Sequence, residues 1–152
     1  MNITKRSDLL IVDNWVDENL LSQESGTNLH RWLVQSEYSD FSKEIHGLIE
    51  QEDLEELEDA FRLHIEFGTG GIRGKMGVGP NRINLRTIGE AAQGLAQYLK
   101  KTWKANIPEC CAVIAYDTRI NSKLFAQETA SVLSGNGIVV YLFDKFRSTP
   151  EL

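Results

Sequence analysis

The segment CAVIAYDTRINSKLFAQETASVLSGNGIVVYLF spans residues 111–143 and contains two short apolar runs separated by a helical pattern. The runs, residues 111–116 and 138–143, are continuous rather than alternating, which is typical of strands covered on both faces. A strand, a helix and a second strand in this order predict a parallel β-sheet with helices packed on its faces. The segment therefore predicts an α/β fold.

Two helices complete this pattern. Asn121 or Ser122 can cap a helix between the strands, and Gly135 and Gly137 can stop it. Residues 84–103 predict a second helix, because apolar side chains recur at helical spacing. Its predicted buried stripe consists of Leu85, Ile88, Ala92, Leu95, Ala96 and Leu99.

A glycine-rich stretch, Phe67-Gly-Thr-Gly-Gly-Ile-Arg-Gly-Lys-Met-Gly-Val-Gly79, precedes this pair of helices and holds six of the twelve glycines. Glycine accepts positive φ and close approach of the backbone to a ligand, so N–H groups can converge on an anion. Arg73 and Lys75 add positive charge, and the planar guanidinium matches phosphate oxygens. The stretch predicts a phosphate-binding loop.

Other interpretations of this loop are weaker. The Walker pattern requires a glycine where Thr69 stands and a hydroxyl where Met76 stands. The dinucleotide fingerprint places Arg73 at its third glycine and requires a preceding apolar strand. A plain surface turn is the usual explanation of a glycine-rich stretch, but the two basic residues, together with the family resemblance described below, favour phosphate binding.

The net charge of −6 divides unevenly along the chain. Residues 1–66 carry five Lys/Arg and sixteen Asp/Glu, a net of −11, whereas residues 67–152 carry a net of +5. This contrast predicts two domains, an acidic helical extension at 1–66 and an α/β domain at 67–152. The second part has no dense basic run, which argues against nucleic acid and favours a small anionic substrate.

The acidic extension predicts several helices. Asp8 precedes an apolar-periodic helix, residues 22–26 predict a loop, and a stripe starting at Leu48 predicts an acidic helix that ends at Phe67. Seven acidic residues between Glu50 and Asp59 predict a solvated helix face.

The composition offers no support for a membrane span or a metal site. Apolar runs are too short to span a bilayer, so the cytoplasm is the expected location. Adjacent Cys110 and Cys111 on a strand point to opposite faces and are expected to be core thiols. The three histidines, at 30, 46 and 64, have no metal-binding spacing.

Polar residues follow both predicted strands. Asp117 and Arg119 come after the first strand, and Ser148 lies shortly beyond the second. Ligands bind beyond the carboxyl ends of parallel strands, so Arg119 is a candidate for phosphate contact. A structural ion pair or a helix-capping contact explains Asp117 and Arg119 equally well.

Three motifs in order resemble those of the α-D-phosphohexomutases, the phosphoglucomutase/phosphomannomutase superfamily. Phe67-Gly-Thr-Gly-Gly-Ile-Arg-Gly74 resembles F-G-T-x-G-[IL]-R-G, and Ala115-Tyr-Asp-Thr-Arg119 resembles G-[YR]-D-x-R with alanine for the first glycine. Ser148-Thr-Pro-Glu-Leu152 is similar to the T-P-x-[LV] stretch. Residues 81–84 and 93–95 resemble most the branch with phosphoglucomutase-2-type and phosphopentomutase-type enzymes.

The resemblance implies a three-layer αβα sandwich, here incomplete and preceded by the helical extension. It also implies an isomerase of carbohydrate metabolism that transfers a phosphoryl group between a phosphoserine and a sugar phosphate through a sugar bisphosphate. Arg73 is then catalytic, next to the phosphoserine, where its charge stabilises the transferring group. Thr69, Gly70, Gly71 and Lys75 join it in phosphate binding, and part of residues 70–78 becomes a strand.

The T-A-S-H-N-P loop that carries the phosphoserine and the D-G-D-x-D loop that holds Mg²⁺ in this family do not occur in residues 1–152. Ser148 and Thr149 are therefore not assigned as nucleophile. We expect an amino-terminal fragment that is inactive alone, that partners the remaining domains of its enzyme, and that self-associates through uncovered sheet. A non-catalytic module that binds phosphosugar or protein is the alternative.

Overall fold

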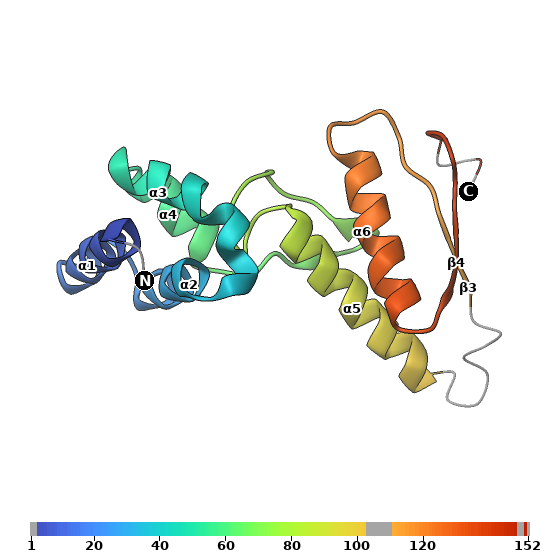
Figure 1. Cartoon of the computed structure of the whole chain (residues 1–152), viewed down its shortest axis with the longest axis horizontal. Helices are drawn as coiled ribbons and strands as arrows, with labels where there is room; N and C mark the ends of the chain where they lie inside the picture. Colours follow the sequence, from blue (N-terminus) through green and yellow to red (C-terminus); the bar gives the residue numbers. More distant parts are fainter. Residues whose placement is uncertain (1–2, 103–110, 149–150, 152) are drawn as a thin grey trace. The chain divides into compact units, whose positions relative to one another are not determined.

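The computed structural model describes residues 3–102, 111–148 and 151. The chain forms two compact units, Met1–Asn84 and Leu85–Leu152. Within the described residues no helix combines the length and the apolar character needed to cross a membrane. Figure 1 shows helices in the first unit and a helix pair beside two strands in the second.

The first unit is mainly helical. Its elements are α1 (Ile3–Asp17), α2 (Gln23–Val34), the 3₁₀ helix η1 (Ser36–Phe41), α3 (Ser42–Glu50), α4 (Leu54–Phe61), β1 (Phe67–Gly68) and β2 (Gly71–Ile72). Trp32 lies at the centre of the core, with ring centroids 4.5 Å from Tyr38 and 5.7 Å from Phe61. Helices α2 and α4 and η1 therefore share one aromatic cluster.

The predicted start of the first helix at Asp8 is wrong, because α1 begins at Ile3. Asp8 lies inside the helix, is buried, and accepts a hydrogen bond from His46 Nδ1 on α3 at 3.0 Å. The predicted loop at 22–26 is also wrong, since Ser22 caps α2 and the helix runs on from Gln23.

The predicted acidic helix ending at Phe67 is interrupted and shorter than expected. Glu52 takes a positive φ of 52°, Asp53 caps α4, and α4 ends at Phe61. The acidic residues are not all solvated either. Glu58 on α4 accepts hydrogen bonds from Ser25 Oγ at 2.7 Å and Ser22 N at 3.0 Å. It therefore joins α4 to the start of α2.

The second unit contains α5 (Leu85–Thr102), β3 (Cys111–Ile114), α6 (Ser122–Gly135) and β4 (Val139–Leu142). Strands β3 and β4 pair in parallel, with Cys111 opposite Val139 and Ile114 opposite Leu142. Helices α5 and α6 pack against each other and against one face of the sheet (Figure 1). The predicted α/β class is confirmed.

The other face of this sheet is exposed, so the predicted coverage of both faces is wrong for the described residues. Val113 is 50% exposed and Tyr141 61% exposed. Cys111 is also exposed and is not the core thiol that the sequence predicted. On α5, the predicted buried residues Leu85 and Leu95 are exposed.

Some predictions cannot be compared with the structure. Trp103, Cys110 and residues 149–150 lie outside the described residues. The predicted division of domains after Glu66 stays a prediction. The first compact unit extends to Asn84, and within it Asn81 N donates a hydrogen bond to Ala60 O on α4 at 3.0 Å.

Gly79 shows how closely this loop packs on α4. Its φ is +115°, and a Cβ built there would lie 2.6 Å from the carbonyl oxygen of Ala60. Pro80 O accepts a hydrogen bond from Ile65 N at 2.9 Å, and Asn81 N donates to Ala60 O at 3.0 Å. Only glycine therefore fits at position 79.

We expect Gly79→Ala to destabilise the first unit by about 2 kcal/mol or more, because it combines a strained φ with a backbone clash. Thermal unfolding followed by tryptophan fluorescence measures this change. Gly47→Ala in α3 is the matched control, since a Cβ there meets nothing within 4 Å. It should leave stability unchanged or raise it by up to about 1 kcal/mol. Equal stability of the two variants would contradict the prediction.

Candidate functional site

The glycine-rich stretch begins with a short antiparallel hairpin. Phe67 pairs with Ile72 and Gly68 with Gly71, which leaves Thr69 and Gly70 in the turn. Gly70 and Gly71 have φ of 90° and 132°. The predicted strand within residues 70–78 therefore exists at Gly71–Ile72, but it pairs with β1 and not with β3 or β4.

Arg73 follows β2 and is exposed. Among the residues that the structure describes, its guanidinium has no hydrogen bond and no ion pair. Thr69, at the turn, is exposed as well. The hairpin thus presents an uncompensated cation beside two glycines in the positive-φ region, an arrangement suited to an anion.

Lys75 has a different environment. Its Nζ lies 3.3 Å from Asp59 Oδ2 and 3.6 Å from Glu56 Oε2, both on α4. The sequence predicted that Lys75 binds phosphate together with Arg73. In the structure its ammonium group is already paired with two carboxylates.

Arg82 is a residue whose importance the sequence reasoning missed. Its side chain is 2% exposed, and its Nη2 lies 2.6 Å from Glu56 Oε1 and 2.6 Å from Asp59 Oδ2. Nη1 donates to the carbonyl oxygen of Asn81 at 3.1 Å. The available signal was the sequence Asn81-Arg-Ile-Asn84, which follows Gly79-Pro80 directly and lies downstream of an acidic helix.

These bonds perturb one carboxyl group. Hydrogen bonds from Arg82 and then from Lys75 lower the pKa of Asp59 below its ordinary value, outweighing the smaller opposing effect of burial. Asp59 therefore stays ionised under mildly acidic conditions and keeps its bonds to the loop.

The segment after Lys75 folds back on itself. Ile83 N donates to Lys75 O at 2.8 Å, and the buried Asn84 Nδ2 donates to Gly77 O and Gly79 O, both at 2.9 Å. Val78 N donates to Glu44 Oε1 on α3 at 3.2 Å. The base of the glycine-rich stretch is therefore fixed, whereas its hairpin is exposed.

In the second unit, Arg119 is 85% exposed and its Nε lies 2.7 Å from Asp117 Oδ2. Hydrogen bonds lower the pKa of Asp117 below its ordinary value, and the bond from the Arg119 backbone N–H is the largest cause. Ser122 Oγ accepts a hydrogen bond from Asp117 N at 3.1 Å. The structural ion pair, one of the two interpretations of these residues, is thus present.

Ser148 also has a local partner. Its backbone N–H donates to Glu151 Oε2 at 2.9 Å, and Glu151 N donates to Ser148 O at 3.0 Å. The Glu151 carboxylate thus reaches back to the Ser148 backbone N–H, as the Glu of a capping box does. The pattern gives Ser148 a structural role.

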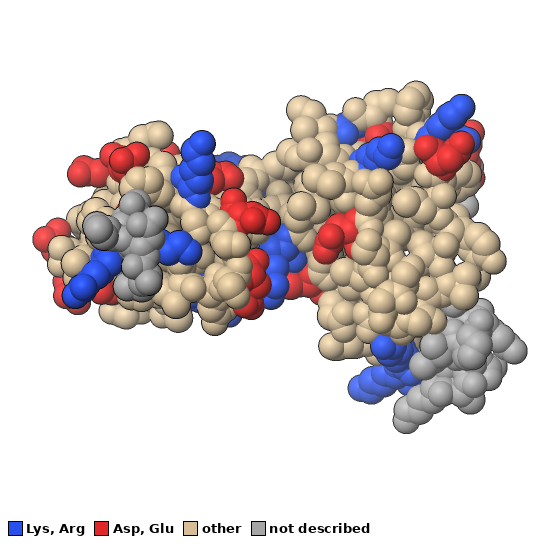
Figure 2. All heavy atoms as spheres, in the orientation of Figure 1, with Lys and Arg blue, Asp and Glu red and all other residues tan. Residues whose placement is uncertain are grey.

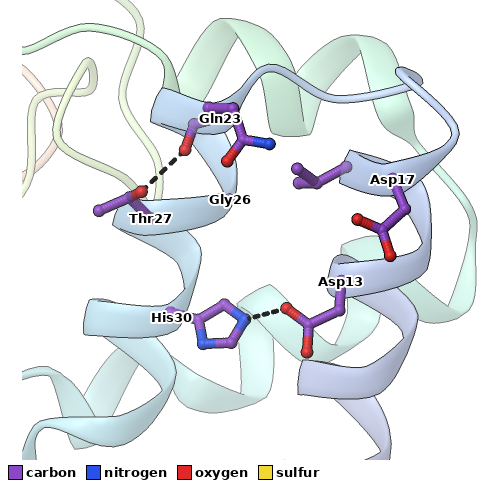
Figure 3. Close-up of a pocket in the computed structure, with 7 residues that line it drawn as sticks. Asp13, Asp17, Gln23, Gly26, Thr27 and His30 are labelled. Carbon is purple, nitrogen blue, oxygen red and sulfur yellow. Dashed lines mark hydrogen bonds and ion pairs between the residues drawn. The ribbon is translucent and has the colours of Figure 1, made fainter.

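A separate hollow of about 590 Å³ lies between α1 and α2 (Figure 3). His30 Nε2 lies 2.8 Å from Asp13 Oδ1 within it, and Asp17 lines it too. Two carboxylates make this hollow unfavourable for phosphate. On the face that Figure 2 draws, acidic side chains also spread over the first unit among basic ones.

No group of three or more His, Cys, Asp or Glu side chains within residues 3–102, 111–148 and 151 could hold a metal ion.

Comparison with known proteins gives the family. The family model "Phosphoglucomutase/phosphomannomutase, alpha/beta/alpha domain I" matches residues 64–152. The phosphoglucomutase of Staphylococcus saprophyticus is 46% identical over 108 residues, covering 71% of this chain and 19% of that protein. The phosphoglucomutase of Staphylococcus aureus strain MRSA252 is 46% identical over 107 residues, covering 70% of this chain and 18% of that protein.

The chain belongs to the phosphoglucomutase/phosphomannomutase family, with its matched part in the αβα domain I. It spans about a fifth of the length of these relatives. No solved structure matches the chain.

We expect Asp59→Asn to lower the unfolding temperature at neutral pH. Because the pKa of Asp59 is lowered in the folded state, its stabilisation is complete above its ordinary pKa and is lost as pH falls through the lowered value. The difference from the parent chain should be constant above about pH 5 and shrink below about pH 4. Thermal melts from pH 2 to 7 measure it.

The matched control is Glu55→Gln, an exposed α4 position. It removes the same charge without removing a bond to the loop, so its melting temperature should stay close to that of the parent chain. A pH-independent difference for Asp59→Asn would contradict the assignment of the ionised carboxylate as the stabilising form.

Proposed function

We propose that this chain provides the phosphoryl-binding loop of a phosphohexomutase, an enzyme that moves phosphate within a hexose or pentose phosphate. Arg73 binds the transferring phosphoryl group, and the backbone of Thr69, Gly70 and Gly71 approaches its oxygens. A planar guanidinium stabilises charge that spreads over phosphoryl oxygens as transfer proceeds. The enzyme acts on a sugar phosphate in the cytoplasm.

The observation that carries the proposal is the contrast between Arg73 and Lys75. Arg73 is exposed and unpaired among the described residues, whereas Lys75 faces Glu56 and Asp59. An unpaired guanidinium can bind phosphate without first breaking an ion pair. Family membership supports the same reaction class, since the two staphylococcal relatives are phosphoglucomutases.

Arg119 is a weaker candidate for phosphate contact. Its guanidinium is bonded to Asp117, and a phosphate would have to compete with that carboxylate. We infer that Arg119 mainly orients the turn between β3 and α6.

The proposal assigns the remaining chemistry to the whole enzyme. The loops that carry the phosphoserine and hold Mg²⁺ in this family do not occur in residues 1–152. The sugar bisphosphate is the intermediate of the whole enzyme's reaction. We infer that these residues alone do not complete a catalytic cycle and act with the other domains of the enzyme. A coupled assay on glucose 1-phosphate with the purified 152-residue chain should give background.

We expect Arg73→Ala in the complete enzyme to lower kcat/KM at least about a hundredfold, the scale of losing one preorganised electrostatic donor. Arg73→Lys should restore little, because an ammonium lacks the planar fork. Steady-state kinetics of both variants test this.

Arg62→Lys on the same unit serves as the control. Arg62 is 62% exposed, and its ion pair with Glu58 is long, at 3.8 Å. Its kinetics should match those of the parent enzyme. A folded Arg73→Ala enzyme with near-normal turnover would refute the role of Arg73. If the complete protein turned over no sugar phosphate but this chain still bound a phosphosugar, the result would favour the non-catalytic module.

We also propose that the 152-residue chain self-associates. The exposed sheet face carries Val113, Val139 and Tyr141, and in the described residues the sheet has only two strands, so its edges can pair with another chain. Sedimentation velocity at several concentrations should show a concentration-dependent increase in mass. Val113→Lys should reduce the association, whereas Lys123→Gln, at an exposed position on α6, should not. A monomer at every concentration would refute this proposal.

A further inference from the structure

Arg82 and Lys75 converge on the same two carboxylates. Arg82 Nε donates to Glu56 Oε1 at 2.8 Å, and its Nη2 reaches Glu56 and Asp59. Lys75 Nζ lies between the other oxygen of Glu56 and Asp59 Oδ2. The cluster holds two positive and two negative charges. Its net charge is zero, so neither cation offers an uncompensated charge to a phosphate.

The two cations differ in burial. Arg82 is 2% exposed and Lys75 68% exposed. Loss of the two carboxylates would be strongly unfavourable for a buried guanidinium, because its charge has little access to water. Arg82 therefore fixes the loop at this point, and Lys75 closes the cluster from the solvent side.

The backbone links this cluster to the base of the hairpin. Ile83, next to Arg82, donates to the carbonyl oxygen of Lys75 at 2.8 Å. Lys75 lies two residues after Arg73. On the other side of the hairpin, Ile65 N donates to Pro80 O at 2.9 Å. Both ends of the segment that carries Arg73 are thus bonded to residues 80–83.

We propose that Arg82 is a positioning residue for the phosphate-binding loop, and that Lys75 is part of the same anchor and not a phosphate ligand. Arg82 holds residues 75–83 on α4, and this fixes the base from which Arg73 extends. A fixed base lowers the conformational entropy that Arg73 loses when it binds phosphate. The inference rests on the proposed function of Arg73.

The test uses the full 152-residue chain and two measurements. Amide hydrogen exchange of Ile83 and Gly77 reports the anchor, because their N–H groups donate to Lys75 O and Ile83 O. Exchange of Arg62 N, which donates to Glu58 O at 3.0 Å, reports the helices. Titration with inorganic phosphate, followed by NMR at the amides of Gly70, Gly71 and Arg73, reports binding.

We expect Arg82→Lys to speed exchange at Ile83 and Gly77 at least about tenfold while leaving Arg62 protected, since a local opening does not require global unfolding. It should weaken phosphate binding at least about fivefold through the lost preorganisation. Arg62→Lys, the matched control, should leave both the exchange at Ile83 and Gly77 and the phosphate affinity unchanged.

Lys75→Gln keeps the proposal testable if Arg82→Lys does not fold, because Lys75 is on the surface. It should change phosphate affinity by no more than about twofold, because its charge is already engaged by Glu56 and Asp59 in exposed ion pairs of small energy, whereas Arg73→Gln should weaken binding at least about tenfold. Weakening by Lys75→Gln as large as that by Arg73→Gln would overturn the assignment of Lys75.

Other outcomes separate the positioning role from the proposed function. Unchanged exchange in folded Arg82→Lys would overturn the anchor. Faster exchange with unchanged phosphate affinity would make Arg82 a purely structural residue and overturn its positioning role. Absence of phosphate binding at Gly70–Arg73 in the parent chain would refute the binding loop itself, and with it the positioning role, while the exchange data would still decide the anchor.

Discussion

The buried guanidinium of Arg82 is the constraint on which the arrangement of the first unit around the glycine-rich stretch depends. A charge with 2% exposure is tolerated only if its donors are paired, and Glu56 and Asp59 on α4 provide this pairing. The spacing of these two acids, three residues apart on one helix face, brings both to the same guanidinium. Part of the acidic character of α4 is therefore explained by its contact with residues 74–84.

This contact in turn explains where glycine is needed and where it is available for binding. At Gly79 the loop approaches the carbonyl of Ala60 so closely that no side chain fits. At Gly70 and Gly71 no neighbour lies within 4 Å of a built Cβ, and positive φ alone favours glycine. Gly79 serves packing, whereas the hairpin glycines, Gly70 and Gly71, leave open space around the backbone beside Arg73.

The sequence predicted what depends on local pattern. The parallel pairing of β3 with β4, the helix over 85–102 and the stop near Gly135 follow from apolar runs, helical spacing and glycine placement. Partners distant in the sequence were not predictable in this way: Asp8 meets His46, Glu58 meets Ser22, and Arg82 meets Glu56. Periodicity tells which face of a helix is apolar, but not which buried polar group finds which partner. The exposed Arg73 agrees with the predicted loop, and its role in phosphate binding stays a prediction.

Charge distribution connects the anchor to the proposed chemistry. With a net charge of −11 over residues 1–66, the first part of the chain repels phosphate unless its acids near the loop are compensated. Arg82 and Lys75 compensate two of them, Glu56 and Asp59, through direct contacts that solvent screens less than distant charges. Exposed acids elsewhere on the unit act through water and salt, where interactions beyond about 10 Å are largely screened. The same cluster that fixes the loop on α4 therefore also compensates two acids of that helix, Glu56 and Asp59, that contact the loop.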